Sequence, residues 1–286
     1  MTLINYYNLY DLLEVKMLKL LFGNSKSLIY EATKEGDIET VINLIKADHN
    51  VNKTGEYNNS PLHLAIIYRH DDILDVLLTH NAKPNATNKH GITPLQIATY
   101  YGCTKNIRKL LEKGAQPDTY NKVGSTALLI AVKYKNAEAV KLLLDFNADF
   151  TKTNNNFLTP LYIAAINGDE DSVNLLLAAG AKANAKHNHD KCPGVMAAYN
   201  GHYKVSNILF SHRYNTRQKE QEKKLAEANR KMVSTDTILN GTKPCKAETI
   251  ATTAENMTNK ASRKIKREVF EIETPDNSQK QKSPRF

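Results

Sequence analysis

The chain has 286 residues, of which 41% are hydrophobic and 24% are charged, and its formal net charge at pH 7 is +9. The apolar fraction is large enough for a packed core, and the mean hydropathy of −0.50 is that of a soluble chain. The three cysteines, Cys103, Cys192 and Cys245, are scattered and odd in number, which excludes a disulfide-built scaffold and favours a reducing compartment.

The first 24 residues are apolar but are interrupted by charges at Asp11, Glu14, Lys16 and Lys19. No stretch approaches the ~18 uninterrupted apolar residues of a membrane span, and the same charges spoil the apolar region of a signal peptide. We predict that residues 1–24 form an amphipathic helix that caps the structure following it. Binding to a membrane surface is the alternative interpretation of the same pattern.

From residue 25 onward the sequence repeats itself every 33 residues, without an insertion, through six copies. Each copy has an Ala four positions after its reference residue and a Leu sixteen positions after it. The reference residues are Leu28, Pro61, Pro94, Ala127, Pro160 and Pro193. A fixed period of this length is typical of a stacked repeat array, in which each repeat buries its apolar faces against its neighbours.

The third copy shows how each repeat is expected to fold. Thr93 and Pro94 are a favourable N-cap and first residue for a short helix, which Gly102 then ends. A second helix follows and ends at Gly114, where a residue that tolerates the left-handed conformation can close it. The polar stretch over residues 113–125 has to cross to the next copy as a turn.

These copies resemble the ankyrin repeat. The family's Thr-Pro-Leu-His-x-Ala pattern is matched by residues 60–65, 93–98 and 159–164, and its Gly-Ala-Asp-x-Asn ending is matched in part by residues 114–118 and 180–184. The resemblance covers about residues 25–213 and implies an all-α repeat solenoid, in which helix-turn-helix units are joined by β-hairpin-like turns. It also implies a non-enzymatic binding role. The first and sixth copies depart from the pattern, as terminal capping repeats do.

The resemblance places the binding surface on a concave face, which is lined by the turn tips and the exposed ends of the first helices. Tyrosine recurs at the helix-end positions of four copies, and tyrosine is enriched in binding hot spots. Cover of neighbouring helices is the alternative role for some of these rings. We predict that the partner-binding residues are Tyr57, Ile67, Tyr68, Lys89, His90, Ile92, Tyr100, Tyr101, Lys133, Tyr134, Ile166 and Tyr199.

No catalytic motif is present in the sequence: we find no Gly-rich phosphate loop, no Cys-x-x-Cys pair and no nucleophile elbow. The segment nearest to a metal site contains His187, His189 and Cys192, but zinc sites usually need four ligands with firmer spacing. We interpret it as a polar turn tip, and we predict no enzyme activity, no metal and no other cofactor. His63 holds the histidine position of the family pattern, which implies a structural hydrogen bond within its own turn.

Residues 214–286 hold 16 Lys and Arg against 10 Asp and Glu, so +6 of the net charge of +9 lies there. We predict a charged helical extension over residues 214–234 and a disordered basic tail over residues 235–286, where apolar residues are too sparse to offset the entropy of ordering. The tail includes a basic patch, which is a candidate for nuclear import or nucleic-acid binding and consists of Arg263, Lys264, Lys266 and Arg267.

The leading functional prediction is a monomeric protein-binding scaffold that uses the concave face. The alternative is a nucleic-acid-associated or nuclear-targeted adaptor that acts through the basic tail. Heavy use of Asn, Lys and Ile suggests an A+T-rich genome, and in this respect the chain resembles ankyrin proteins of intracellular bacteria, which implies a host-directed effector. We therefore expect the protein in the cytoplasm or secreted into a host cell, with an unidentified protein partner.

Overall fold

The computed structural model describes residues 27–184 and 192–239, with side chains through residue 230. The chain divides into two compact units, Met1–Lys219 and Glu220–Phe286, and the repeats belong to the first. All regular elements in the described ranges are helices. The prediction of an all-α repeat solenoid is therefore confirmed.

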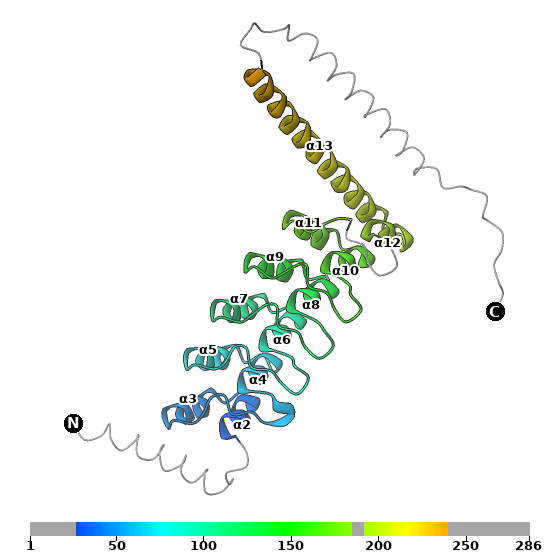
Figure 1. The fold of residues 1–286 in the computed structure, drawn as a ribbon. Coiled ribbons are helices and arrows are strands. Elements are labelled where there is room, and N and C mark those ends of the chain that lie inside the picture. The colour runs from blue at the N-terminus through cyan, green and yellow to red at the C-terminus, as the bar shows by residue number, and fades with distance from the viewer. Residues whose placement is uncertain (1–26, 185–191, 240–286) are drawn as a thin grey trace, which may run out of the picture. The chain divides into compact units, whose positions relative to one another are not determined.

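Each repeat contributes two helices, and we call the first the inner helix and the second the outer helix. Figure 1 shows the two rows that these helices form. The connecting loops project beyond the inner row (Figure 1). The inner helices are α2 (Leu28–Glu35), α4 (Pro61–Ile67), α6 (Pro94–Tyr100), α8 (Ala127–Lys133), α10 (Pro160–Asn167) and α12 (Pro193–Tyr199). The outer helices are α3 (Ile38–Lys46), α5 (Asp71–Thr79), α7 (Thr104–Glu112), α9 (Ala137–Asp145), α11 (Glu170–Ala178) and the first part of α13 (Tyr203–Leu239).

The inner helices begin where the cap residues predict. The hydroxyls of Thr93, Thr126 and Thr159 each accept a hydrogen bond from the backbone N–H three residues later, at 3.3 Å. Such a bond satisfies one of the donors that a helix leaves open at its N-terminus. Pro at the first helical position adds a backbone angle that is already suited to a helix.

The turn between the two helices of a repeat requires a left-handed residue, and the six copies supply it differently. Gly36, Gly102, Gly168 and Gly201 have φ between 67° and 82° there, whereas Arg69 and Lys135 adopt φ of 61° and 54°. These two positions have no glycine, so they accept the steric cost of a β-carbon in this conformation. The turn geometry is thus set by the repeat and not by the local residue.

The core is continuous along the array, because each helix packs on its partner and on the equivalent helix of the next repeat. The recurring Ala on the inner helices and the recurring Leu on the outer helices are all at most 5% exposed. The small Ala lets neighbouring helices approach closely, and the Leu fills the space between the layers. The predicted register of the core is confirmed.

Asparagine side chains stabilise the loops through hydrogen bonds to the backbone, which explains part of the high asparagine content. Asn88, Asn121 and Asn154 occupy one register position, and the side-chain oxygen of each accepts hydrogen bonds from two backbone N–H groups of its own loop tip, at 2.9–3.1 Å. At a second position, Asn52 and Asn85 each accept from a backbone N–H of the next repeat at 2.7 Å. Exposed and half-buried loop amides are satisfied in this way.

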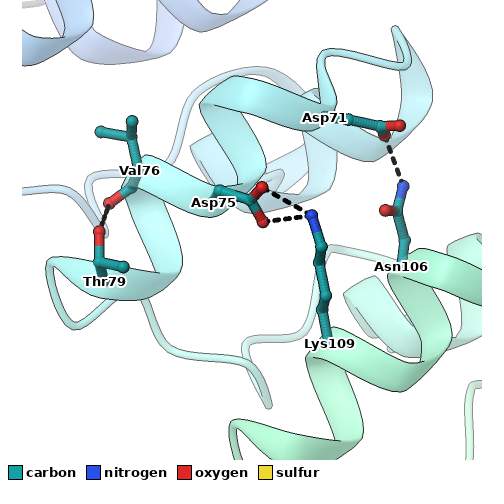
Figure 2. Close-up of polar contacts among 6 residues, drawn as sticks. All are labelled: Asp71, Asp75, Val76, Thr79, Asn106 and Lys109. Carbon is teal, nitrogen blue, oxygen red and sulfur yellow. Dashed lines mark hydrogen bonds and ion pairs between the residues drawn. The ribbon is translucent and has the colours of Figure 1, made fainter.

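Two polar contacts tie the second outer helix to the third, as Figure 2 shows. The carboxylate of Asp75 accepts from the ammonium of Lys109 at 2.6 Å, and Asp71 accepts from the amide of Asn106 at 2.8 Å. Both members of the ion pair are partly exposed, so we assign it only about 0.2–1 kcal/mol of stability. The apolar core therefore dominates the energetics of the stack.

The last helix differs from the other outer helices in its length. α13 contributes buried Val205 and Leu209 to the core and then continues to Leu239, whereas the other outer helices stop after nine residues. Arg213 occupies the position of Gly114, Asn147 and Gly180, which close the preceding outer helices with a positive φ. Arg213 has no positive φ, so the helix does not end there. Its end lies five residues inside the segment predicted to be disordered from residue 235 onward. The predicted capping helix over residues 1–24 lies outside the described residues, as do residues 240–286 of the predicted tail.

Candidate partner-binding face

The inner face is the name we use here for the loop tips together with the C-terminal ends of the inner helices. Of the twelve residues predicted to bind a partner, nine have exposed side chains, and Ile67, Ile92 and Ile166 are partly buried. The repeat brings the helix-end residues into register, because positions 33 residues apart lie on successive inner helices. The repeat alone therefore brings tyrosines of successive copies close together.

Three tyrosines form one connected cluster at the ends of α6 and α8. The rings of Tyr100 and Tyr101 meet edge to face with centroids 5.3 Å apart, and Tyr100 meets Tyr134 of the next repeat in the same way at 5.0 Å. This is the favoured geometry for aromatic pairs. The three side chains remain 40–54% exposed, so a large aromatic surface faces outward. We call Tyr100, Tyr101 and Tyr134 the tyrosine cluster.

Cations flank the tyrosine cluster on both sides. The guanidinium of Arg69, from the preceding repeat, lies 6.0 Å from the centroid of Tyr101, and the ammonium of Lys133 lies 5.7 Å from that of Tyr134. Both distances are within the range of a cation–π interaction. The cluster is thus an apolar centre between two positive charges.

The loop tips form a second part of the inner face. Successive tips are joined by backbone hydrogen bonds, from Lys89 N–H to the carbonyl of Tyr57 at 2.8 Å and from Lys122 N–H to that of His90 at 3.0 Å. The ammonium of Lys89 also lies 3.7 Å from the centroid of the Tyr57 ring. These contacts give adjacent tips a fixed spacing, which suits them to present side chains to a partner.

The predicted partner-binding residues leave out Phe157, an exposed side chain at the tips. Phe157 is 62% exposed and has a φ of 59°. The equivalent positions in the two preceding loops are Gly91 and Gly124, which also have positive φ. A bulky residue in this region is an outlier, and such strain clusters at functional sites. The signal was visible in the sequence as a Phe in the register position of two glycines.

Several predicted residues have structural contacts or lie apart from the cluster. The backbone carbonyl of Ile92 accepts a hydrogen bond from His63, and that of Ile166 accepts one from Asn200. Tyr68 stacks on His70 with ring centroids 6.1 Å apart. Tyr199 is exposed at the end of α12, two repeats beyond Tyr134. The structure therefore brings together only part of the predicted set.

His63 makes a wider network than the one predicted within its own turn. The backbone N–H of Ser60 donates to Nδ1 of His63 at 3.1 Å, and Nε2 lies 3.0 Å from the carbonyl oxygen of Ile92 in the next loop. Burial lowers the pKa of His63 to about 4, although its hydrogen bond to Ile92 acts in the opposite direction. The imidazole is therefore neutral at pH 7, with its proton on Nε2.

The remaining predictions concern segments that are described in part or not at all. The candidate metal segment falls mostly on residues 185–191, outside the described ranges, and Cys192 is the N-cap of α12. Among the described residues, no group of three or more His, Cys, Asp or Glu is placed to hold a metal ion. None of the helices described is long and apolar enough to cross a bilayer. The basic patch in the tail also lies outside the described residues.

The stacked helix pairs and the exposed inner face define a repeat solenoid of the kind that presents an extended binding surface. The family model described as ankyrin repeats (3 copies) matches residues 28–121 and 116–187, which together make up more than half of the chain. The chain belongs to the ankyrin repeat family. Members of this family generally mediate protein–protein interaction and are typically non-enzymatic scaffolds. A search among curated proteins found no match to the chain.

Proposed function

We propose that this protein is a non-enzymatic scaffold that binds a partner protein on its inner face, with the tyrosine cluster at the centre of the contact. The observation that carries this proposal is the exposure of three tyrosines on adjacent repeats, of which Tyr100 packs on both of the others. Tyrosine supplies a large amphipathic contact area at low cost in side-chain entropy, and it is enriched in hot spots near the centre of interfaces.

The position of the cluster along the array supports the same proposal. Tyr100, Tyr101 and Tyr134 belong to the third and fourth of six repeats, so a partner that covers the array would exclude water best at this point. The cluster is also separate from the core, because the helices are held by the buried Ala and Leu positions. Binding and folding are thus assigned to different residues of the same repeat.

Site-specific photo-crosslinking tests the proposal. A photoreactive phenylalanine analogue would replace Tyr101 in one full-length protein and Lys141, exposed on α9, in another. Both proteins would be irradiated in an extract of the cells in which the protein acts. We expect a crosslinked protein partner from position 101 and none of the same mass from position 141. The same partner crosslinked from position 141 alone would contradict the assignment of the inner face.

A narrower proposal is that the partner belongs to a host cell and that the protein is a bacterial effector. Its support is the composition, which is rich in Asn, Lys and Ile. A translocation reporter fused to the full chain would test it in an infection assay: reporter signal in the host cytosol would support the proposal, and retention in the bacterium would contradict it.

A further inference from the structure

We propose that the inner face recognises an acidic segment of its partner, in which an apolar side chain is flanked by carboxylates on both sides. The apolar side chain would lie on the tyrosine cluster, and the carboxylates would pair with Arg69 and Lys133. This inference rests on the proposed function and specifies the chemistry of the partner. The segment lies across the repeats, because the two cations come from the second and fourth copies.

Around the tyrosine cluster, the charged residues at the inner-helix ends are all positive. The inner-helix ends of repeats two to four span residues 66–70, 99–103 and 132–136, and they include Arg69, Lys133 and Lys135 but no Asp or Glu. The tips of the third and fourth repeats add Lys89 and Lys122, and the tip of the second carries Glu56. Since both charge and apolar area are exposed here, the complementary ligand is acidic and apolar.

The acidic residues near this region are placed elsewhere or are isolated. Asp71 begins the outer helix α5 and accepts a hydrogen bond from Asn106, so it is engaged in the outer layer. Glu56 is an exposed carboxylate at the first tip, where its charge contributes to the raised pKa of buried Tyr30 after the larger effect of burial. Among the residues that the structure describes, no carboxylate forms an ion pair with Arg69 or Lys133.

The spacing of the two cations predicts the spacing of the acids. Packed helices are about 8–10 Å apart, so helix ends two repeats apart are separated by roughly 16–20 Å. An extended peptide advances about 3.3 Å per residue, so this distance corresponds to about five or six residues. We expect the two acidic positions at that separation, with the apolar anchor between them.

A single-stranded nucleic acid is the other polyanion that combines with basic and aromatic groups, but the ring geometry favours a peptide. Base stacking needs an open aromatic face. In the cluster, the rings are packed edge to face on one another, and Arg69 and Lys133 lie over Tyr101 and Tyr134. Aliphatic or aromatic side chains can pack against such edges, and carboxylates can reach the cations.

Selection from a phage-displayed library of random peptides tests the inference, with the full-length protein as bait. We expect the enriched peptides to carry Asp or Glu on both sides of a Phe, Leu, Ile or Tyr. Binding of a selected synthetic peptide should weaken by about tenfold or more in Arg69→Glu, Lys133→Glu at low salt. The charge-matched control is Lys105→Glu, Lys141→Glu on the outer helices, which should bind as the wild type does. Circular dichroism melts would show that both variants fold.

The outcomes separate this inference from the proposed function. Enriched peptides that depend on Tyr101 and Tyr134 but carry no acidic excess would overturn the inference and leave the proposed function intact. Enriched peptides that are indifferent to the two tyrosines would overturn both, as would the absence of any enrichment. Tyrosine-dependent binding of a labelled oligothymidylate in preference to the acidic peptides would overturn the inference in favour of nucleic acid.

Discussion

Nε2 of His63 donates a hydrogen bond to the carbonyl oxygen of Ile92, one repeat further along the chain, at 3.0 Å. In the next copy Gln96 takes over this connection: its side-chain amide donates to the carbonyl of Ser125 at 3.0 Å, and its oxygen accepts from Thr93 N–H at 3.2 Å. Two different side chains thus make the same bridge 33 residues apart. One of them can be titrated and the other cannot.

The stability of the array should therefore depend on pH through His63. Burial lowers its pKa from the ordinary 6.5 to about 4, so the folded state holds the neutral form. The contribution of His63 to the free energy of unfolding is fully present above pH 6.5. It is lost as the pH falls from there to about 4, because only the unfolded chain binds the proton in that range. The loss amounts to about 3 kcal/mol. Hydrogen bonds from Thr40 and Thr151 lower the pKa values of Asp37 and Asp149, whose contribution is lost at still lower pH.

His63→Gln should remove most of this pH dependence, because Gln96 shows that glutamine fits the register position. Urea unfolding at pH 7.5 and pH 4.5 would measure it. We expect wild type to lose stability between the two values and the variant to lose much less. His80→Gln, at an exposed site, is the control and should behave as wild type. Equal pH dependence in wild type and His63→Gln would show that His63 is not the titrating group.

Ala131→Glu tests the register of the core. Ala131 is fully buried in α8, so the substitution would place a carboxylate between helices. We expect a loss of about 3–5 kcal/mol from an unpaired buried charge. Because each repeat is stable only through its neighbours, the loss should be evident in a thermal melt of the whole array. Lys141→Glu, on the exposed side of α9, should change the melt little, and an unchanged melt of Ala131→Glu would refute the core register.

Phe157→Gly should stabilise the fold. Glycine fits the left-handed backbone at this position, as it does at Gly91 and Gly124, so we expect a gain of about 0.5–1 kcal/mol. Gly91→Phe is the matched reverse change, and it should destabilise by about 1–2 kcal/mol, since its β-carbon would also lie 3.2 Å from the backbone nitrogen of Lys122. Thermal melts of both variants would measure these effects. A destabilised Phe157→Gly would mean that the ring contributes to packing and is not kept for binding.

The repeat made most of the fold predictable from the sequence. Pro94, Ala98 and Leu110 recur at fixed intervals, so helix starts, core positions and register followed from counting. For the binding face, the sequence predicted which positions of the repeat contribute residues but not how their side chains contact one another. Whether Tyr100 would contact Tyr101, Tyr134 or neither depends on side-chain rotamers, which a periodic pattern does not determine.

Exceptions to the pattern were the hardest features to interpret. Phe157 was overlooked because only its register with Gly91 and Gly124 marks it in the sequence, and its positive φ is seen directly only in the structure. The bridge from His63 to Ile92 was underestimated for a related reason: it crosses to the next repeat, where no sequence motif marks the acceptor. The length of α13 reflects the lack of a Gly or Asn that would end the helix. The lack of such a residue predicts a helix boundary less well than its presence does.

The proposed function requires that the binding energy be concentrated in the tyrosine cluster. Calorimetric titration of the captured partner into Tyr101→Ala, Tyr134→Ala measures it directly, because these partly exposed side chains can be truncated without disturbing the buried Ala and Leu positions. We predict weaker binding by at least ~2 kcal/mol, about thirty-fold in affinity, with the melting transition retained. The control, Lys46→Ala, Lys141→Ala on the outer helices, should be nearly neutral. If the lysine pair weakens binding and the tyrosine pair does not, the inner face is not the binding site.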